Sequence, residues 1–415
     1  MSNWSGSMSD WSTAPLPEVL EFREGPGIMA ADFRDGGVPL IRLAGLKLGA
    51  NLLNGCNYLD PAKVEQKWKQ FRLRKGDVLL STSASLGEVA TVVDEGVGAV
   101  PYTGIICFRP RDCRVDPRFI QHMLRTPSFK NQIEAMGVGS VMKHFGPSHL
   151  RSMTVSYPGV RTQRAIADVL GALDDKIAAN NRLSATARSL ADAIFMKSLR
   201  QGFGTPMTLG ELASRGVLTL GDGYRTKRAE HGWPGYRILR AGDVRDGRIA
   251  PEGDDFVSKS YAGQIGSKLS QPGDIILTTK GSVGRVAVVP PDLEVVVYSP
   301  QICYFRVLDK EMIDSSYLAS WFRSSDLQAQ ASQLMFKSDM APYINLRDIR
   351  TLVVPVPGKI EQCKQVEVQR GLLDVVHAAH SENKRLGRTR DELLPLLMSG
   401  KARVREAEKV VEGVV

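Results

Sequence analysis

Two long stretches of the chain place apolar residues at alternating steps of three and four. This heptad-like spacing predicts two long helices, over 161–200 and 359–400, each with a narrow apolar seam. At about 1.5 Å per residue, a helix of roughly 39 residues spans about 58 Å and protrudes from a small domain. The first seam carries Ile166, Leu170, Leu173, Ile177, Asn180, Ala187, Leu190 and Ile194, and the second carries Leu372, Val376, Ala379, Asn383, Leu386, Arg390, Leu393 and Leu397.

The two seams predict that the helices pair with each other. Antiparallel pairing would place one globular domain at each end of an elongated, pseudo-twofold dumbbell, whereas parallel pairing would crowd both domains together. Asn180 and Asn383 fall on the seams, where a polar residue commonly fixes the register at some cost in stability. We expect Pro395 to kink or end the second helix one turn before Gly400, because proline has no N–H to donate.

A β-type pattern occurs twice, at 76–90 and at 273–287. Each copy opens with Gly-Asp, continues with a run of Val, Ile and Leu, and ends in a second Gly before another Val-rich run. The pattern predicts a strand, a tight Gly/Ser turn and a return strand. Asp77 and Asp274 recur in the copies, and a Gly-Asp step before a strand is more often a turn with a side-chain hydrogen bond than an acid catalyst.

The repeat extends over most of the chain. Pro-Gly steps at 158–159 and 357–358 lead into Gln163 and Gln362, where the helical patterns begin. The order of segments is the same in both halves, so we interpret the chain as a tandem duplication. Further matching pairs are 102–107 with 298–303, 116–120 with 314–318, and 150–155 with 349–354.

These patterns predict an α/β (α+β) protein with two tandem globular domains and two long antiparallel coiled-coil helices. We expect a mobile leader at 1–13, because this segment is rich in Ser and lacks a signal-peptide pattern. The globular domains are predicted at 14–160 and 201–358, and the helices at 161–200 and 359–400. A charged segment at 401–415 is expected to be a frayed tail.

Composition narrows the function classes. The formal net charge of +9 and the pI of about 9.3 favour a polyanionic partner such as double-stranded DNA, although a mildly basic enzyme would look similar. Five cysteines without a Cys-x-x-Cys pair are typical of a reduced, cytoplasmic protein. No apolar run approaches the length of a membrane span.

Motifs of catalysis are missing from the sequence. It contains no Walker-type nucleotide loop, no G-x-G-x-x-G helix start and no Asn-Pro-Pro-aromatic or Asp-Pro-Pro-aromatic methyltransferase tetrapeptide. His377 and His380 could share a helix face, but no further metal ligand accompanies them, so a place beside the seam is favoured. Asp60 with 65–67 resembles a nuclease pattern only faintly, and a solvated helix face explains it better.

Basic and aromatic residues in loops are the candidates for DNA contact. A Gly-rich loop at 221–228 could follow a phosphate backbone or enter a groove. Lys280 and Arg285 replace Ser83 and Glu88 of the first copy, as two domains that read different bases would require. For each residue alone, a solvated surface explains the pattern equally well. The candidates are Lys143, His144, Tyr224, Arg225, Lys227, Arg228, Lys280, Arg285 and Tyr343.

The duplicated hairpin, the Pro-Gly step, the Gln at each helix start and the heptad helices together make the chain resemble the specificity subunit of type I restriction–modification systems. The resemblance covers nearly all of 14–400. It implies two target-recognition domains, each reading half of a bipartite DNA site, and helices that space them and dock two methyltransferase subunits. It also implies that this chain binds no cofactor itself: S-adenosylmethionine belongs to the methyltransferase subunits, and ATP and Mg²⁺ to the two restriction subunits of systems that have them.

Two other functions stay open on the sequence alone. A self-contained nuclease with a duplicated recognition domain would need a carboxylate and metal cluster, which the sequence does not show. An interaction scaffold without a DNA role would use the long helices for docking, and the positive charge argues against it only weakly.

Overall fold

The computed structural model describes residues 11–415 except 48–49, 83–86, 137–144, 203, 246, 252, 282 and 336–342. The chain forms two compact units. Unit 1 comprises residues 1–185 and 376–415, and unit 2 comprises residues 186–375. Each unit therefore contains one globular domain, called domain 1 or domain 2, and a part of both long helices.

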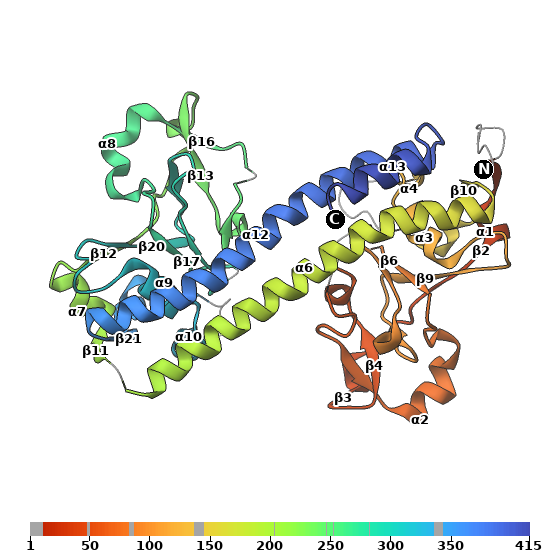
Figure 1. Ribbon diagram of the computed structural model, residues 1–415. Coiled ribbons are helices and arrows are strands. Elements are labelled where there is room, and N and C mark those ends of the chain that lie inside the picture. The colour runs from red at the N-terminus through yellow and green to blue at the C-terminus, as the bar shows by residue number, and fades with distance from the viewer. Residues whose placement is uncertain are drawn as a thin grey trace. The chain divides into compact units, whose positions relative to one another are not determined.

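Domain 1 is built on two four-stranded sheets, in the orders β2-β9-β6-β7 and β3-β5-β4-β8 (Figure 1). A short β1–β10 pair closes the domain beside the helices. The strands are β1 (Ser12–Pro15), β2 (Leu20–Glu24), β3 (Phe33–Arg34), β4 (Val38–Ile41), β5 (Asn57–Leu59), β6 (Val78–Ser81), β7 (Val89–Thr91), β8 (Val100–Pro101), β9 (Ile105–Pro110) and β10 (Thr154–Tyr157). The helices are α1 (Leu16–Val19), α2 (Pro61–Lys63), α3 (Pro117–Leu124), α4 (Pro127–Met136) and α5 (Pro147–Leu150).

Domain 2 repeats this topology with sheets β12-β20-β17-β18 and β16-β13-β19, the pair β11–β21, and an added β14–β15 ribbon. The strands are β11 (Thr205–Thr208), β12 (Leu218–Asp222), β13 (Gly235–Leu239), β14 (Val244–Arg245), β15 (Arg248–Ile249), β16 (Phe256–Ser258), β17 (Ile275–Thr278), β18 (Val286–Val288), β19 (Val296–Tyr298), β20 (Ile302–Val307) and β21 (Val353–Val356). The helices are α7 (Leu209–Ser214), α8 (Ala262–Ile265), α9 (Ser315–Arg323), α10 (Ser325–Met335) and α11 (Leu346–Ile349).

The duplication preserves the strand register in the β6–β9 and β17–β20 pairs, although domain 2 has no counterpart of β3 in its second sheet. Val78 lies opposite Phe108 in the β6–β9 pair, and Ile275 lies opposite Phe305 in the equivalent β17–β20 pair. In both domains the second sheet contains one parallel pair, β4–β8 or β13–β19. The predicted hairpins are present as β6–β7 and β17–β18. Their connections at 82–88 and 279–285 are longer than the tight turn that we expected.

The long helices are α6 (Val160–Arg200) and α12 (Lys359–Met398). In unit 1 they run antiparallel, because Asp174 contacts Arg390 while Asn180, further along α6, contacts the earlier residue Asn383. The side chains of Asn180 and Asn383 hydrogen-bond directly, with a nitrogen–oxygen distance of 3.0 Å. Buried apolar residues of both helices continue the core of domain 1, namely Ile166, Leu170, Leu173, Ile177, Leu386, Leu393, Leu394 and Leu397.

The seam changes phase in unit 2. Leu190 is 48% exposed, so its predicted place on the seam is wrong, and the neighbouring Ala191 is buried instead. Phe195 belongs to the core of domain 2, and Gln369 of α12 donates a hydrogen bond to the carbonyl of Ala191 at 2.7 Å. Here α6 faces a globular core as well as a helix, so its buried positions no longer follow the heptad. Leu372 is half-buried, and Val376 in unit 1 is buried.

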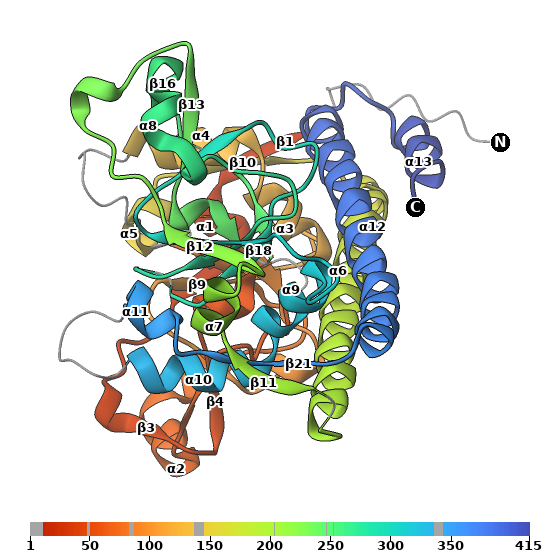
Figure 2. The ribbon, with the colours of Figure 1, turned by 90° about the vertical axis from the view of Figure 1, so that its left-hand side faces the viewer.

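Three expectations about the ends of elements are wrong. Ser12 and Thr13 pair with β10, so the predicted mobile leader does not include them. Helix α12 does not end at Pro395, as one of our two expectations had it, but continues to Met398, and Gly400, with φ of +68°, follows its end in the left-handed conformation. The predicted frayed tail forms α13 (Val404–Glu412), which lies beside the end of α12 because Ala407 and Val411 join the core of unit 1 (Figure 2).

Candidate nucleic-acid interface

The two Gly-Asp carboxylates are structural. Both oxygens of Asp274 accept hydrogen bonds from Arg306 at 2.7 Å, and one also accepts from the Tyr298 hydroxyl at 2.6 Å. Asp77 binds Arg109 with the same two-pronged geometry. Each carboxylate also accepts a backbone N–H from its own turn, from Arg74 or Gln271. Buried and fully hydrogen-bonded carboxylates of this kind hold the sheet to the preceding turn and leave no free acid for catalysis.

In the Gly-rich loop of domain 2, Tyr224 packs against the domain, whereas the cationic side chains are exposed. Tyr224 is half-buried and packs on an apolar cluster that includes Val257 and Ile265. Burial and a hydrogen bond with Glu230 raise its pKa. Lys227 donates its backbone N–H to the buried carboxylate of Glu230 at 3.0 Å, which fixes the turn. The side chains of Arg225, Lys227 and Arg228 are exposed, so the loop presents three positive charges on a constrained backbone.

A second group of candidates meets at the connection of the β17–β18 hairpin. Lys280 and Tyr343 form an antiparallel bridge, although they are far apart in the sequence. Lys280 is exposed and Tyr343 is 41% exposed, so both can reach a ligand. Arg285 instead donates to the carbonyl of Val244 at 3.1 Å and supports the β14–β15 ribbon. Lys143 and His144 lie outside the described residues.

Domain 1 carries a basic cleft that the sequence analysis missed. The cleft has a volume of about 530 Å³ and lies along the β2–β9 edge. Arg23 donates to the carbonyl of Gln70 at 2.8 Å and stacks over the ring of Phe71. Arg109 lies in β9 and Arg111 directly follows this strand, so the two arginines, two positions apart, are on the same face. This spacing is the sequence signal that could have revealed the cleft. Its arginines are Arg23, Arg74, Arg109 and Arg111.

A buried glutamine anchors each long helix to its domain. The side-chain oxygen of Gln163 accepts the backbone N–H of Asp116 at 2.8 Å, and its amide donates to the carbonyls of Arg114 and Pro158. Gln362 makes the same three contacts in unit 2, with Asp314, Met312 and Pro357. Both glutamines are fully buried, so the angle between domain and helix is set by three hydrogen bonds in each half.

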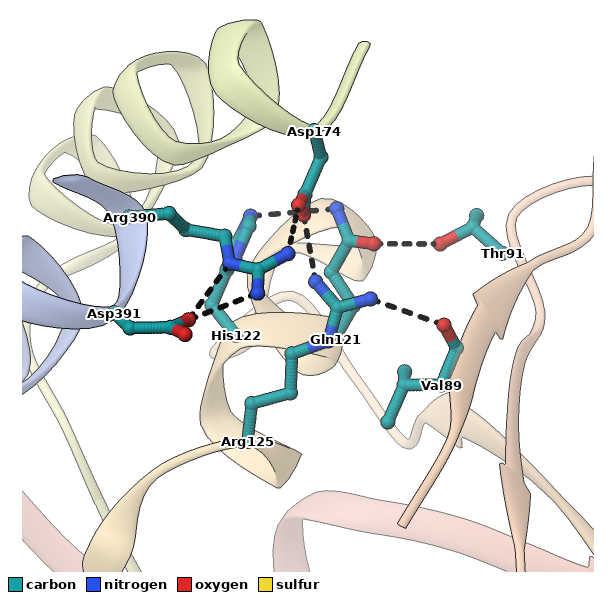
Figure 3. A network of polar contacts seen from close by, with 8 residues as sticks. All are labelled: Val89, Thr91, Gln121, His122, Arg125, Asp174, Arg390 and Asp391. Atoms are coloured by element: carbon teal, nitrogen blue, oxygen red, sulfur yellow. Dashed lines mark hydrogen bonds and ion pairs between the residues drawn. The ribbon is translucent and has the colours of Figure 1, made fainter. Parts of the chain in front are cut away.

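A charged network joins domain 1 to both helices (Figure 3). Asp174 of α6 accepts hydrogen bonds from Arg125 at 2.6 Å and from Arg390 of α12 at 2.9 Å. Burial raises the pKa of Asp174, but the two arginines outweigh it and hold the pKa below its usual value. Arg125 also donates to the carbonyl of Val89 in β7. Arg390, which interrupts the predicted apolar seam, is therefore neutralised within the unit.

His122 lies beside this network at the edge of α3. The residue is 1% exposed, and its Nε2 lies 3.3 Å from the side-chain nitrogen of Gln121. Burial lowers the pKa of His122 to about 3, with Arg125 and Arg390 acting in the same direction against the attraction of Asp174. The imidazole is thus neutral at physiological pH, and its burial marks a structural role.

Among the described residues, no three His, Cys, Asp or Glu side chains are grouped closely enough to hold a metal ion. His377 is exposed on α12. Asp60 caps α2 by accepting the N–H of Lys63, and Glu65 pairs with Lys69 and Arg72. In the part of the chain that the structure describes, no helix combines the length and apolarity needed to cross a bilayer.

Comparison with known proteins gives a consistent result. The chain is similar to the type I restriction enzyme MjaVIII specificity subunit of Methanocaldococcus jannaschii, with 20% identity over 95% of this chain and 94% of that protein. The putative MjaX specificity subunit of the same organism has 20% identity over the same shares. The S subunit of a type I system from M. genitalium has a similar fold, with a TM-score of 0.51 and 17% identity over 93% of this chain and 96% of that one.

The family described as type I restriction modification DNA specificity domain matches residues 8–187 and again 208–384. Each match begins near the start of one globular domain and ends within the following long helix, as the internal duplication requires. The chain belongs to the type I restriction–modification DNA specificity family and carries two copies of its domain in tandem.

Proposed function

We propose that this chain is the non-catalytic DNA-reading subunit of a type I restriction–modification complex, in which domains 1 and 2 each read one half of a bipartite site. The observation that carries the proposal is one fold occurring twice, with the same register in the β6–β9 and β17–β20 pairs and with different exposed side chains. A shared frame with differing loops supports two readers of different base sequences.

The DNA contacts are assigned to the exposed cations of each domain. In domain 2 they are Arg225, Lys227 and Arg228 of the Gly-rich loop, together with Lys280 and Tyr343 at the hairpin connection. In domain 1, the exposed arginines of the cleft, Arg23, Arg74 and Arg111, offer guanidinium groups to backbone phosphates, whereas Arg109 is held by Asp77. Phosphate contacts of this kind make binding strongly salt-dependent.

The helices serve as spacer and as docking surface for two methyltransferase subunits. Support comes from large apolar side chains exposed one heptad apart, Leu183 and Leu190 on α6 and Val368 and Val375 on α12. Exposed apolar residues at regular spacing are typical of protein interfaces. S-adenosylmethionine is bound by the methyltransferase subunits, and ATP with Mg²⁺ by restriction subunits where the system has them. The complex acts in the cytoplasm.

The test is DNA binding by this chain in complex with its methyltransferase subunit. Fluorescence anisotropy with duplex DNA is measured at several salt concentrations for the wild type and for a Lys227→Gln/Arg228→Gln variant. In a plot of the logarithm of the binding constant against the logarithm of the salt concentration, each lost phosphate contact is expected to reduce the magnitude of the slope by about 1. Arg215→Gln, an exposed arginine of the same domain, is the matched control. An unchanged slope in the loop variant would exclude this loop from the interface.

A further inference from the structure

The two halves differ at one half-buried position that the duplication makes directly comparable. Arg125 follows α3 in domain 1 and corresponds to Arg323 at the end of α9 in domain 2, because the Asp-capped helices that carry them align. Arg125 is neutralised by Asp174 of α6. The equivalent of Asp174 on α12, counted from the matching glutamines Gln163 and Gln362, is Leu373. The second half therefore keeps the arginine and lacks its carboxylate.

A cavity of about 260 Å³ lies at this place in unit 2. Arg323 and Leu373 both line it, together with Arg188 of α6 and Gln369 of α12. Gly284, from the hairpin connection, lines the same cavity. It is thus lined by domain 2 and by parts of both helices that belong to the same unit, in the position that the Asp174 network occupies in unit 1.

The electrostatics of the cavity favour an anion. Among the described residues, no carboxylate pairs with the guanidinium of Arg323. Asp192 also lines the cavity, but it accepts hydrogen bonds from the backbone and hydroxyl of Ser325. Burial lowers the pKa of Arg323 to about 10, with a contribution from the charge of Arg188. Arg323 is therefore still a cation at neutral pH.

We infer that this cavity is a binding site for a small oxyanion of the size of phosphate, held by Arg323. The bound ion takes the place that the Asp174 carboxylate has in the first half. It connects domain 2 to the helices through a ligand, where the first half uses a side chain of its own. A half-buried guanidinium without a carboxylate partner gains from a bound oxyanion, because a charge-assisted hydrogen bond is stronger than a neutral one.

The experiment is isothermal titration of the full-length chain, in complex with its methyltransferase subunit, with inorganic phosphate in chloride buffer at constant ionic strength. The wild type should bind with saturation. Arg323→Gln should weaken binding at least about tenfold, since it removes a charge-assisted contact. Arg215→Gln should bind like the wild type. Working at low millimolar phosphate keeps the general stabilisation by excluded salts small.

A second variant tests the same site without removing the arginine. Leu373→Asp supplies the missing carboxylate from within the chain, as in the first half. It should abolish phosphate binding and raise the melting temperature in phosphate-free buffer, while removing any further rise on adding phosphate. Absence of saturable binding by the wild type would overturn the inference. Equal phosphate affinity in the wild type, Arg323→Gln and Leu373→Asp would overturn it as well. Neither result bears on DNA reading, which the loop variants test separately.

Discussion

The side-chain oxygen of Gln163 accepts the backbone N–H of Asp116 at 2.8 Å, from the first turn of α6 to the N-cap of α3. Gln362 and Asp314 repeat this contact in the second half at 2.7 Å. The glutamine therefore ties the start of each long helix to the residue that begins a helix of the domain. We call this glutamine contact the joint, because it connects each globular domain to the helix that follows it.

Replacing either glutamine by alanine should destabilise its own unit. Gln163→Ala leaves a buried N–H, the buried carbonyl of Pro158 and the carbonyl of Arg114 without their partner, so we expect a loss of about 2–4 kcal/mol in the free energy of unfolding. Urea denaturation followed by circular dichroism measures the loss. Gln201→Ala, at an exposed position just after α6, serves as control. Equal midpoints for Gln163→Ala and the control would contradict the role of the joint.

Removing the carboxylate of Asp174 should be costly, because it leaves the half-buried Arg125 without a counter-charge and Arg390 with only the exposed Asp391 as its partner. Asp174→Ala is expected to lower the free energy of unfolding by about 3–5 kcal/mol. The adjacent Asp175 is exposed, so Asp175→Ala should change stability by less than about 0.5 kcal/mol. Chemical denaturation of the two variants measures their free energies of unfolding. Similar free energies for both would mean that the charged network contributes little to stability.

The burial of His122 predicts a loss of stability at mildly acidic pH. Its pKa of about 3 in the folded protein lies below the usual 6.5, so between these values the unfolded chain binds a proton that the folded chain does not. Stability therefore rises with pH through this window and falls as the pH is lowered. From pH 7 to pH 5 the loss from this group is about 2 kcal/mol.

His122→Gln should remove this part of the pH dependence, measured as the difference between denaturation midpoints at pH 7 and pH 5. The exposed His377 provides the control, since His377→Gln should keep the wild-type dependence. Wild-type behaviour in His122→Gln would assign the acid sensitivity to other groups.

Helix length should set the spacing of the half-sites. Inserting seven residues into α6 adds about 10 Å to the spacer, so the methylated site should be lost or re-spaced. The same insertion after Gly413, beyond α13, should leave the site unchanged. Sequencing of methylated host DNA distinguishes these outcomes, and an unchanged gap with the longer α6 would refute the spacer role.

Repeated patterns were enough to predict the duplicated domains, the hairpins and the two long helices. The spacing of apolar residues did not predict the buried positions of α6 where the packing partner of the helix changes. Leu190 fits the heptad, yet Ala191 is buried because domain 2 contributes a second contact surface to α6. The short α13 is mostly polar, so its sequence did not predict a helix. Its few apolar residues pack on the core of unit 1 beside the end of α12, and this contact depends on the tertiary structure.

The candidate site was harder to predict than the fold. Tyr224 looked like a DNA contact but packs on its own domain, while the arginine cleft of domain 1 draws on segments far apart in the sequence. Asp174, Arg125 and Arg390 come from three separate helices or their ends. Such clusters depend on tertiary placement, which no local pattern encodes.

The most direct test of the central claim is a methylation map. The chain is co-expressed with its methyltransferase subunit, and a second strain carries the chain with residues 201–358 exchanged for those of another family member. The account predicts a split motif with a fixed gap, of which the exchange alters one half and leaves the other unchanged. A contiguous motif, or an exchange that alters both halves or neither, would contradict it.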